Sequence, residues 1–230
     1  MDKPITTLFM LTSLDGKIST GSNNSLDFDS DFPKIKGLKE GLKQYYDIEQ
    51  KTDLFSFNSG KVQAKIGINK KNDTISKTPV SFLVVDNKPH LNKIGMTNLL
   101  KKSKKLFIIT TNKKHPAFNF KNVDNLEIIY YSRKIDFVDL FLKFKQLYNI
   151  KSMTIQTGSE LNSTLLRLGL IDKVSIVISP ALIGGKDTSS LIGGDSIDSI
   201  DKLKLIKTLK LIDVIKLKHS YIQLKYKVNN

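Results

Sequence analysis

The stretch MTIQTGSELNSTLLRLGLID (residues 153–172) indicates a strand that turns sharply at Gly158 and continues as a helix. The apolar stripe of the predicted helix consists of Leu161, Leu165 and Leu168. Thr157 and Glu160 have the spacing of a capping box, so the helix is predicted to take Thr157 as its N-cap. A strand that leads directly into a helix is the repeating unit of a parallel sheet, so this stretch favours an α/β fold.

The glycine turn also has a chemical consequence. Because Gly158 lacks a side chain, another group can approach the backbone closely. The first amides of the following helix would then bind an anion such as a phosphate. The dinucleotide fingerprint G-x-G-x-x-G is absent, and a capping box explains Thr157 and Glu160 without any ligand. The turn by itself therefore leaves two interpretations open, a nucleotide site and a plain helix start.

Strands and helices are predicted to alternate along the whole chain. The predicted strands are 5–14, 53–58, 80–86, 105–111, 125–132, 152–157 and 173–179. The predicted helices are 32–50, 96–103, 136–149 and 160–168. The tail (207–228) alternates on both sides of His219 and Ser220, as a β-hairpin would. The sequence therefore predicts one α/β domain over residues 1–230, with a mixed, mostly parallel central sheet and a closing antiparallel hairpin.

The composition narrows the class of protein. The chain has 230 residues, of which 40% are hydrophobic, as in an ordinary globular domain with a sizeable core. It has no cysteine, which excludes disulfides, thiolate metal sites and cysteine nucleophiles. The N-terminal segment is a poor signal peptide, and no stretch reaches eighteen apolar residues. We therefore expect a cytoplasmic protein without a membrane partner.

The formal net charge of +15 raises the alternative of a basic nucleic-acid-binding protein. Only Arg133 and Arg167 are arginines, however, whereas base readout and bidentate phosphate contacts favour arginine. The lysines are scattered apart from KKSKK (101–105), which fits the C-terminal end of a helix. A nucleic-acid partner is therefore disfavoured, although the positive field would favour anionic ligands.

No metal site is predicted. Asp27, Asp29 and Asp31 alternate as in a calcium loop, but Phe32 stands where that loop requires glycine. The three histidines lack the spacing of metal ligands and are interpreted as isolated: His90, His115 and His219.

Two segments carry a resemblance to a known family. SLDGKIST (13–20) follows the first predicted strand, and TGSELNSTLLRLGLIDKVSIVISPALIGGKDT (157–188) follows a later one. In order and spacing they resemble the dihydrofolate-reductase-like reductases of riboflavin biosynthesis, the C-terminal reductase domain of the deaminase–reductase family. The resemblance implies a three-layer α/β/α fold, NADPH as the hydride donor and a homodimer.

The resemblance also implies a set of site residues. The loop over the cofactor pyrophosphate would consist of Gly158, Ser159, Glu160 and Leu161. Further contacts to NADPH would come from a second glycine loop and a strand end: Asn58, Ser59, Gly60, Thr110 and Thr111. Asp15 and Lys17 match the residues that face the substrate, so they are the predicted catalytic pair. Without the resemblance, Asp15 and Gly16 would be interpreted as a simple turn.

Two further substrate-side positions depart from the family pattern. Gln156 replaces a glutamate, and Lys65 replaces an acidic residue that helps to hold the substrate. Loss of a polar partner weakens specificity that depends on buried pairing, so the riboflavin precursor is in doubt as the substrate. With these departures, the resemblance implies an NADPH-dependent reductase that transfers hydride to a C=N or C=O carbon of a small heterocyclic or phosphorylated substrate.

Three alternatives remain beside this prediction. The first is the riboflavin-pathway reductase itself, which acts on 5-amino-6-(5-phosphoribosylamino)uracil. The second is a basic, non-catalytic nucleic-acid-binding protein. The third is a degenerate fold that keeps the dimer and has lost catalysis.

Overall fold

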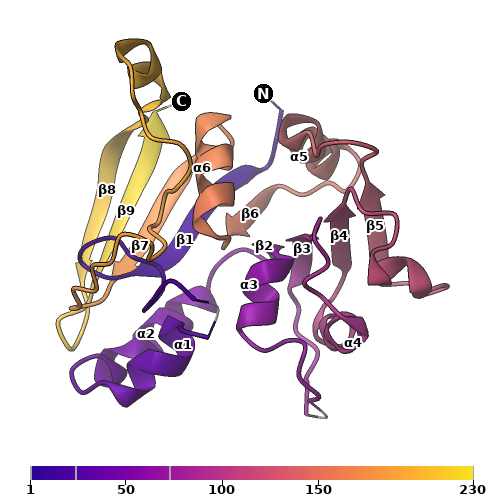
Figure 1. The fold of residues 1–230 in the computed structure, drawn as a ribbon, viewed down its shortest axis with the longest axis horizontal. Coiled ribbons are helices and arrows are strands. Elements are labelled where there is room, and N and C mark those ends of the chain that lie inside the picture. The colour runs from indigo at the N-terminus through magenta and orange to yellow at the C-terminus, as the bar shows by residue number, and fades with distance from the viewer. Residues whose placement is uncertain (1, 24, 73, 230) are drawn as a thin grey trace. The chain divides into compact units, whose positions relative to one another are not determined.

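The computed structural model describes residues 2–23, 25–72 and 74–229, and strands and helices alternate along them (Figure 1). The chain divides into two compact units. The first comprises Met1–Pro4 and Asp53–Thr157, and the second comprises Ile5–Thr52 and Gly158–Asn230. The single domain expected from the sequence stays a prediction, and each unit is described by itself. Within the described residues, no helix combines the length and the apolar character that crossing a membrane requires.

The first unit is built on five strands that pair in parallel. They are β2 (Phe55–Ser59), β3 (Ser81–Val85), β4 (Leu106–Thr110), β5 (Leu126–Tyr130) and β6 (Ser152–Ile155). Their order is β5-β4-β3-β2-β6. The connecting helices are α3 (Gly60–Lys65), α4 (Lys93–Lys102), the 3-10 helix η2 (Pro116–Asn119) and α5 (Phe137–Gln146). The near-continuous burial of β3 and β4 is typical of parallel strands covered on both faces.

Helices cover both faces of these strands. One core cluster joins α4 to β3 and β4 through Val84, Met96, Leu99 and Ile108. Phe107, the neighbour of Ile108, faces the opposite side of the sheet. There the rings of Phe57 and Phe107 contact Phe144 of α5, with ring centroids 6.2 and 6.3 Å apart. The first unit therefore has the three layers α/β/α that the resemblance implies.

The second unit mixes parallel and antiparallel pairing. Its strands are β1 (Ile5–Thr12), β7 (Lys173–Ile178), β8 (Thr208–Lys216) and β9 (Ile222–Asn229). Their order is β1-β7-β9-β8, in which β1 and β7 are parallel and the other two pairs are antiparallel. The helices are α1 (Phe28–Asp31), η1 (Phe32–Lys34), α2 (Lys39–Glu49), α6 (Ser159–Arg167) and η3 (Ile200–Leu205).

The core of the second unit joins α2 to β1 and β7. Phe9 of β1 stacks on Tyr45 of α2 with ring centroids 5.1 Å apart, and Tyr221 is fully buried in the same cluster. A Cβ atom on Gly41 would lie 2.3 Å from the Tyr221 ring, so this position in α2 requires glycine. The helix therefore keeps a residue of low helix propensity because the core ring occupies the space of a side chain.

The predicted α/β class, the mostly parallel pairing and the closing hairpin are confirmed. The hairpin turns at His219 and Ser220, whose φ angles of 56° and 63° are left-handed. The helix predicted over 32–50 is wrong in one respect, because it divides into η1 and α2. Gly37 lies between the two helices with a φ of +89°, a conformation that interrupts a right-handed helix.

Candidate active site

Asn58, Ser59 and Gly60 lie at the junction of β2 and α3 in the first unit. The buried Asn58 side chain donates a hydrogen bond from Nδ2 to Ser56 Oγ over 2.7 Å. Ser59 is the N-cap of α3 and accepts from the backbone N–H of Val62. The predicted second glycine loop therefore lies at the C-terminal end of a parallel strand, where open α/β sheets bind ligands.

A short chain of hydrogen bonds joins this loop to Gln156, which follows β6. Ser56 Oγ accepts from Asn58 and lies 3.1 Å from Gln156 Oε1, to which it donates. Asn58, a predicted cofactor residue, and Gln156, a predicted substrate residue, are thereby linked through Ser56, which belongs to no motif. Ser56 and Asn58 are two residues apart in β2 and therefore lie on the same face of the strand, a pattern that could have indicated their contact. Lys65 is the last residue of α3, about 8 Å along the helix axis from Gly60.

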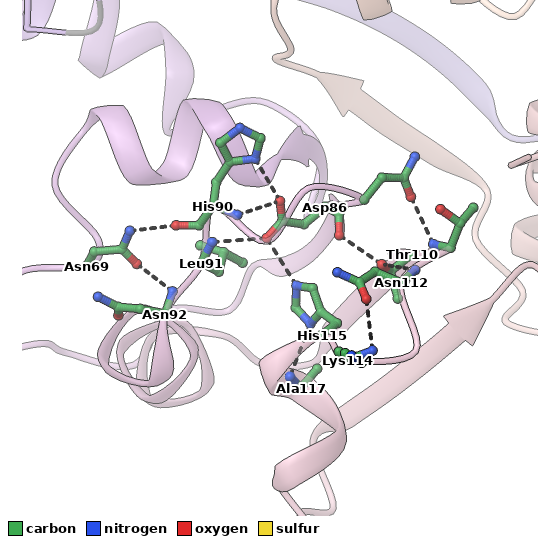
Figure 2. Close-up of polar contacts among 12 residues, drawn as sticks. Asn69, Asp86, His90, Leu91, Asn92, Thr110, Asn112, Lys114, His115 and Ala117 are labelled. Atoms are coloured by element: carbon green, nitrogen blue, oxygen red, sulfur yellow. Dashed lines mark hydrogen bonds and ion pairs between the residues drawn. The ribbon is translucent and has the colours of Figure 1, made fainter.

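A buried carboxylate, Asp86, lies directly after β3 and organises the next group (Figure 2). Its Oδ1 accepts from the backbone N–H and from Nδ1 of His90, over 3.1 and 3.0 Å. Its Oδ2 accepts from the backbone N–H of Leu91 and from Nε2 of His115, both over 3.0 Å. Burial raises the pKa of Asp86, but the hydrogen bonds from His115, Leu91 and His90 outweigh it and hold the pKa below its usual value.

The interpretation of His90 and His115 as isolated residues is wrong, because both bind the same carboxylate. The Nδ1 atom of the buried His115 accepts from the backbone N–H of Ala117, so its proton lies on Nε2 and points to Asp86. Both ring nitrogens of His115 are thus used within the protein. Among the described residues, no group of three or more histidine, aspartate or glutamate side chains could hold a metal ion.

Thr110 and Thr111, at the end of β4, are tied to the segment that follows β3. Thr110 is fully buried and donates from Oγ1 to the backbone carbonyl of Asp86 over 2.9 Å. The backbone N–H of Thr111 donates to Asn87 Oδ1 over 2.9 Å. Asp86 also lies against Gly60, where an added Cβ would come within 2.4 Å of the carboxylate. Asp86 therefore connects two of the predicted cofactor segments, and no motif in the sequence pointed to it.

In the second unit, Asp15 follows β1 and binds the loop that follows β7. Its carboxylate accepts from the Ser13 hydroxyl over 2.5 Å and from the backbone N–H groups of Gly184 and Ile183 over 2.6 and 3.2 Å. The hydrogen bond from Ser13, followed by that from Gly184, lowers the pKa of Asp15 to about 2. Asp15 is therefore ionised at neutral pH, a state in which a carboxylate accepts hydrogen bonds and has no proton to donate.

Lys17 binds the same loop, residues 183–188, through its positively charged ammonium group. Its Nζ donates to the backbone carbonyls of Gly185 and Thr188 over 2.9 and 3.0 Å. The structure thus brings the predicted catalytic pair together on residues 183–188, with Asp15 on amides and Lys17 on carbonyls.

The start of α6 differs from the predicted capping box. Gly158, not Thr157, is the N-cap, and a glycine has no side chain with which to cap the helix. Glu160 instead accepts from the backbone N–H of Gly194 over 3.0 Å. A Cβ atom on Gly158 would meet no described atom within 4 Å. The N-cap residue itself therefore contributes no side-chain acceptor to the electropositive end of α6.

The glycine-rich segment 191–195 packs along the first turns of α6. The backbone N–H of Gly193 donates to the Ser159 carbonyl over 3.2 Å, and Asn162 Nδ2 donates to the Leu191 carbonyl over 2.9 Å. A Cβ on Gly193 would lie 2.4 Å from Ser159 Oγ. These contacts hold Ser159 and Glu160 in place, and Leu161 completes the turn as a half-buried residue.

Comparison with known proteins places this geometry in a family. The sequence model described as the RibD C-terminal domain matches residues 4–217. The riboflavin biosynthesis protein RibD of Actinobacillus pleuropneumoniae is 27% identical over 228 residues, which cover 96% of this chain and 57% of that protein. A 2,5-diamino-6-ribosylamino-4(3H)-pyrimidinone 5′-phosphate reductase of Methanothermobacter thermautotrophicus is 34% identical over 87 residues, which cover 36% of each chain.

Solved structures show the same fold. Acinetobacter baumannii RibD superposes with a TM-score of 0.68 and 17% identity, over 100% of this chain and 59% of that one. The riboflavin biosynthesis reductase Rib7 of Saccharomyces cerevisiae superposes with a TM-score of 0.60 and 16% identity, over 100% of this chain and 91% of that one. This chain thus spans somewhat more than half the length of the RibD relatives. Because the family model covers most of its residues, the chain belongs to the RibD C-terminal domain family.

Proposed function

We propose that this chain is an NADPH-dependent reductase of riboflavin biosynthesis that reduces a small, phosphorylated heterocyclic substrate at a C=N or C=O carbon. The observation that carries the proposal is the glycine N-cap of α6, Gly158, with open space beside it, in a chain that matches the RibD C-terminal domain over 4–217. Membership of a reductase family supports a nicotinamide cofactor, and the names of relatives support a ribosylaminopyrimidine phosphate as the substrate.

The proposed cofactor residues suit a dinucleotide phosphate. A helix end without a capping side chain presents N–H donors and a positive dipole, and a glycine there lets a phosphate reach the backbone. We assign Gly158, Ser159, Glu160 and Leu161 to the pyrophosphate. In the first unit, contacts to the cofactor are assigned to Asn58, Ser59, Gly60, Thr110 and Thr111. Bound NADPH would supply the hydride, and these residues would bind and orient it.

Roles on the substrate side follow from the charges. The Lys17 ammonium has three N–H donors, of which two reach backbone carbonyls, and we assign the third to the substrate phosphate. Asp15 keeps the loop 183–188 in position as an ionised acceptor rather than by transferring a proton. Gln156 is assigned to the heterocycle, and Lys65 adds positive charge that favours a phosphorylated substrate.

We also propose that the active form is a homodimer. Large apolar side chains of η3 and β8 are exposed: Ile200, Leu203, Leu209, Leu211, Ile212 and Val214. Among the described strands, β8 pairs with β9 alone and presents a long apolar edge. An edge of this kind favours pairing with another chain, here a second copy. A nucleic-acid partner is not part of the proposal.

Titration of NADPH fluorescence with the wild type, Gly158→Ala and Gly158→Val tests the proposal. Gly158 has a φ of −79°, which any residue adopts, and space for a side chain, so all three proteins should fold alike. We expect sub-millimolar NADPH binding by the wild type and a dissociation constant about tenfold or more higher for Gly158→Val, with Gly158→Ala between them.

Three outcomes would count against the proposal. If the wild type binds neither NADPH nor NADH below the millimolar range, the reductase proposal fails. Equal NADPH binding by Gly158→Val would remove the pyrophosphate assignment. Binding to DNA or RNA that weakens steeply with salt would favour the nucleic-acid alternative.

A further inference from the structure

We propose that Asp86 is a positioning residue for cofactor binding, which holds the first turn of α3 and the end of β4 in fixed positions through a hydrogen bond from His115. The inference rests on the proposed function, because it concerns the cofactor segments at Gly60 and Thr110. It adds a positioning role for Asp86 and His115, a buried pair that takes no direct part in the proposed reduction.

The Asp86 carboxylate has a fixed orientation. Its Oδ1 accepts from the backbone N–H and from Nδ1 of His90 (Figure 2). Its Oδ2 accepts from the backbone N–H of Leu91 and from Nε2 of His115. An ionised carboxylate only accepts, so both imidazoles donate to it. With four donors converging from different directions, the group cannot rotate without leaving a buried donor unsatisfied.

This fixed carboxylate lies directly on the backbone of Gly60. A Cβ atom at Gly60 would come within 2.3 Å of Asp86 Cγ and within 2.4 and 2.7 Å of its two oxygens. Gly60 is the first residue of α3, and Ser59 before it is the N-cap. A displacement of the Asp86 carboxylate therefore changes the position of the β2–α3 junction.

The backbone of the same residue holds the end of β4. The Asp86 N–H donates to the Ile109 carbonyl over 2.9 Å, and Thr110 Oγ1 donates to the Asp86 carbonyl over 2.9 Å. One residue thus sets the α3 junction with its side chain and the β4 end with its main chain. Small displacements of binding groups have large effects on ligand affinity and on reaction rates, so this linkage bears directly on the cofactor.

His115 supplies the donor that makes the arrangement rigid. Its Nδ1 accepts from Ala117, which leaves the proton on Nε2, aimed at Asp86 Oδ2. Because both nitrogens are hydrogen-bonded within the protein and the ring is buried, His115 serves as a structural donor to Asp86. Its role is therefore to position Asp86, and through Asp86 the cofactor segments.

Two substitutions at His115 separate its two hydrogen bonds. In His115→Gln the side-chain amide nitrogen takes the place of Nε2 and still donates to Asp86. In His115→Asn the side-chain oxygen takes the place of Nδ1 and still accepts from Ala117, as an Asx cap does. We expect the NADPH dissociation constant to rise about tenfold in His115→Asn and less than about threefold in His115→Gln, with kcat at saturating NADPH little changed.

Gly60→Ala provides a second test that does not require a substitution at His115. Its added methyl group displaces the same carboxylate, so its dissociation constant should also rise. Combined with His115→Asn, the effect should be less than additive because both changes act through Asp86. In the protein without cofactor, hydrogen exchange of the Val62 amide, which is bonded to Ser59, should be faster in His115→Asn than in His115→Gln.

The outcomes distinguish this inference from the proposed function. Failure of the wild type to bind NADPH overturns the proposed function. Wild-type binding together with equal dissociation constants for His115→Asn and His115→Gln overturns the positioning role. Faster Val62 exchange with unchanged NADPH binding shows that the pair only stabilises the unit, and this result also overturns the inference.

Discussion

Asp15 carries its negative charge because its neighbours donate hydrogen bonds to it, and this makes its contribution to stability depend on pH. The hydrogen bonds from Ser13 and Gly184 lower its pKa from 3.8 to about 2. A group whose pKa is lower in the folded state contributes stability above its unfolded pKa, and the contribution is lost as the pH falls through the folded pKa. The loop 183–188 is therefore held by Asp15 at neutral pH and released only in strong acid.

Substitution Asp15→Asn tests this dependence. We expect the melting temperature to fall by about 2–4 °C near pH 7, the change that about 1 kcal/mol produces in a chain of this size. The difference from the wild type should be constant above about pH 5 and should shrink as the pH approaches 2. Thermal melts between these values measure it, with Asp187→Asn, an exposed residue of the same loop, as the control. A difference that is the same at every pH would contradict the role of the ionised carboxylate.

At the scale of single residues, the sequence predicts which residues belong to the site better than it predicts which residues they contact. Asp15 and Lys17 were selected by their motif, but their binding to residues 183–188 depends on the pairing of β1 with β7. Asp86 was not selected, since His90 and His115 lie 4 and 29 residues away from it and form no motif. Their convergence follows from the order of β3 and β4 in the sheet, which local patterns do not encode.

At the scale of elements, α6 combines a weak helix start with the proposed binding of the cofactor phosphates. Aspartate and asparagine are better N-caps than glycine, by a few tenths of a kcal/mol, and an acidic group at a helix start gains about 0.3–1 kcal/mol from the dipole. With Gly158 at the N-cap, α6 is therefore less stable than it would be with aspartate or asparagine at this position. A cofactor phosphate at the same amides would explain why a glycine is used there.

Gly158→Asp and Gly158→Asn form a matched pair for this argument. Both should cap α6 and raise the melting temperature slightly, but only the aspartate should repel a phosphate. We expect NADPH to bind more weakly to Gly158→Asp than to Gly158→Asn, and the gap should narrow at high salt because ions screen the repulsion. Titration at two salt concentrations measures the gap. Equal affinities for the two variants would show that no phosphate lies near this helix start.

The elements were predictable to different degrees for physical reasons. Strands such as β3 and β4 are short apolar runs, a signal that lies within the local sequence, so their predicted positions are close to those observed. The start of α6 was misplaced by one residue, because Glu160 binds Gly194 and does not complete the local capping box. The six-residue helix α3 was missed since it is too short to show a helical period.

At the scale of the whole molecule, the exposed apolar surface of η3 and β8 is the basis for the proposed dimer. Exposed substitutions cost little in the folded monomer, so Ile212→Lys combined with Val214→Lys should leave the melting temperature almost unchanged. The same pair would place charges in an interface that includes β8 and should prevent association. Leu147→Lys is the control, because Leu147 is 70% exposed and belongs to the first unit.

The net charge of +15 determines whether salt should strengthen or weaken dimerisation. Two copies repel each other, and salt screens that repulsion, so dimerisation should strengthen between about 50 and 300 mM salt. Binding to a nucleic acid would weaken over the same range, because the release of counterions gains less entropy at higher salt. Sedimentation equilibrium should therefore give twice the chain mass of 25.9 kDa for the wild type and for Leu147→Lys, but a single mass for the double variant. A wild type that stays monomeric at every salt concentration would mean that the apolar edge of β8 serves no second copy.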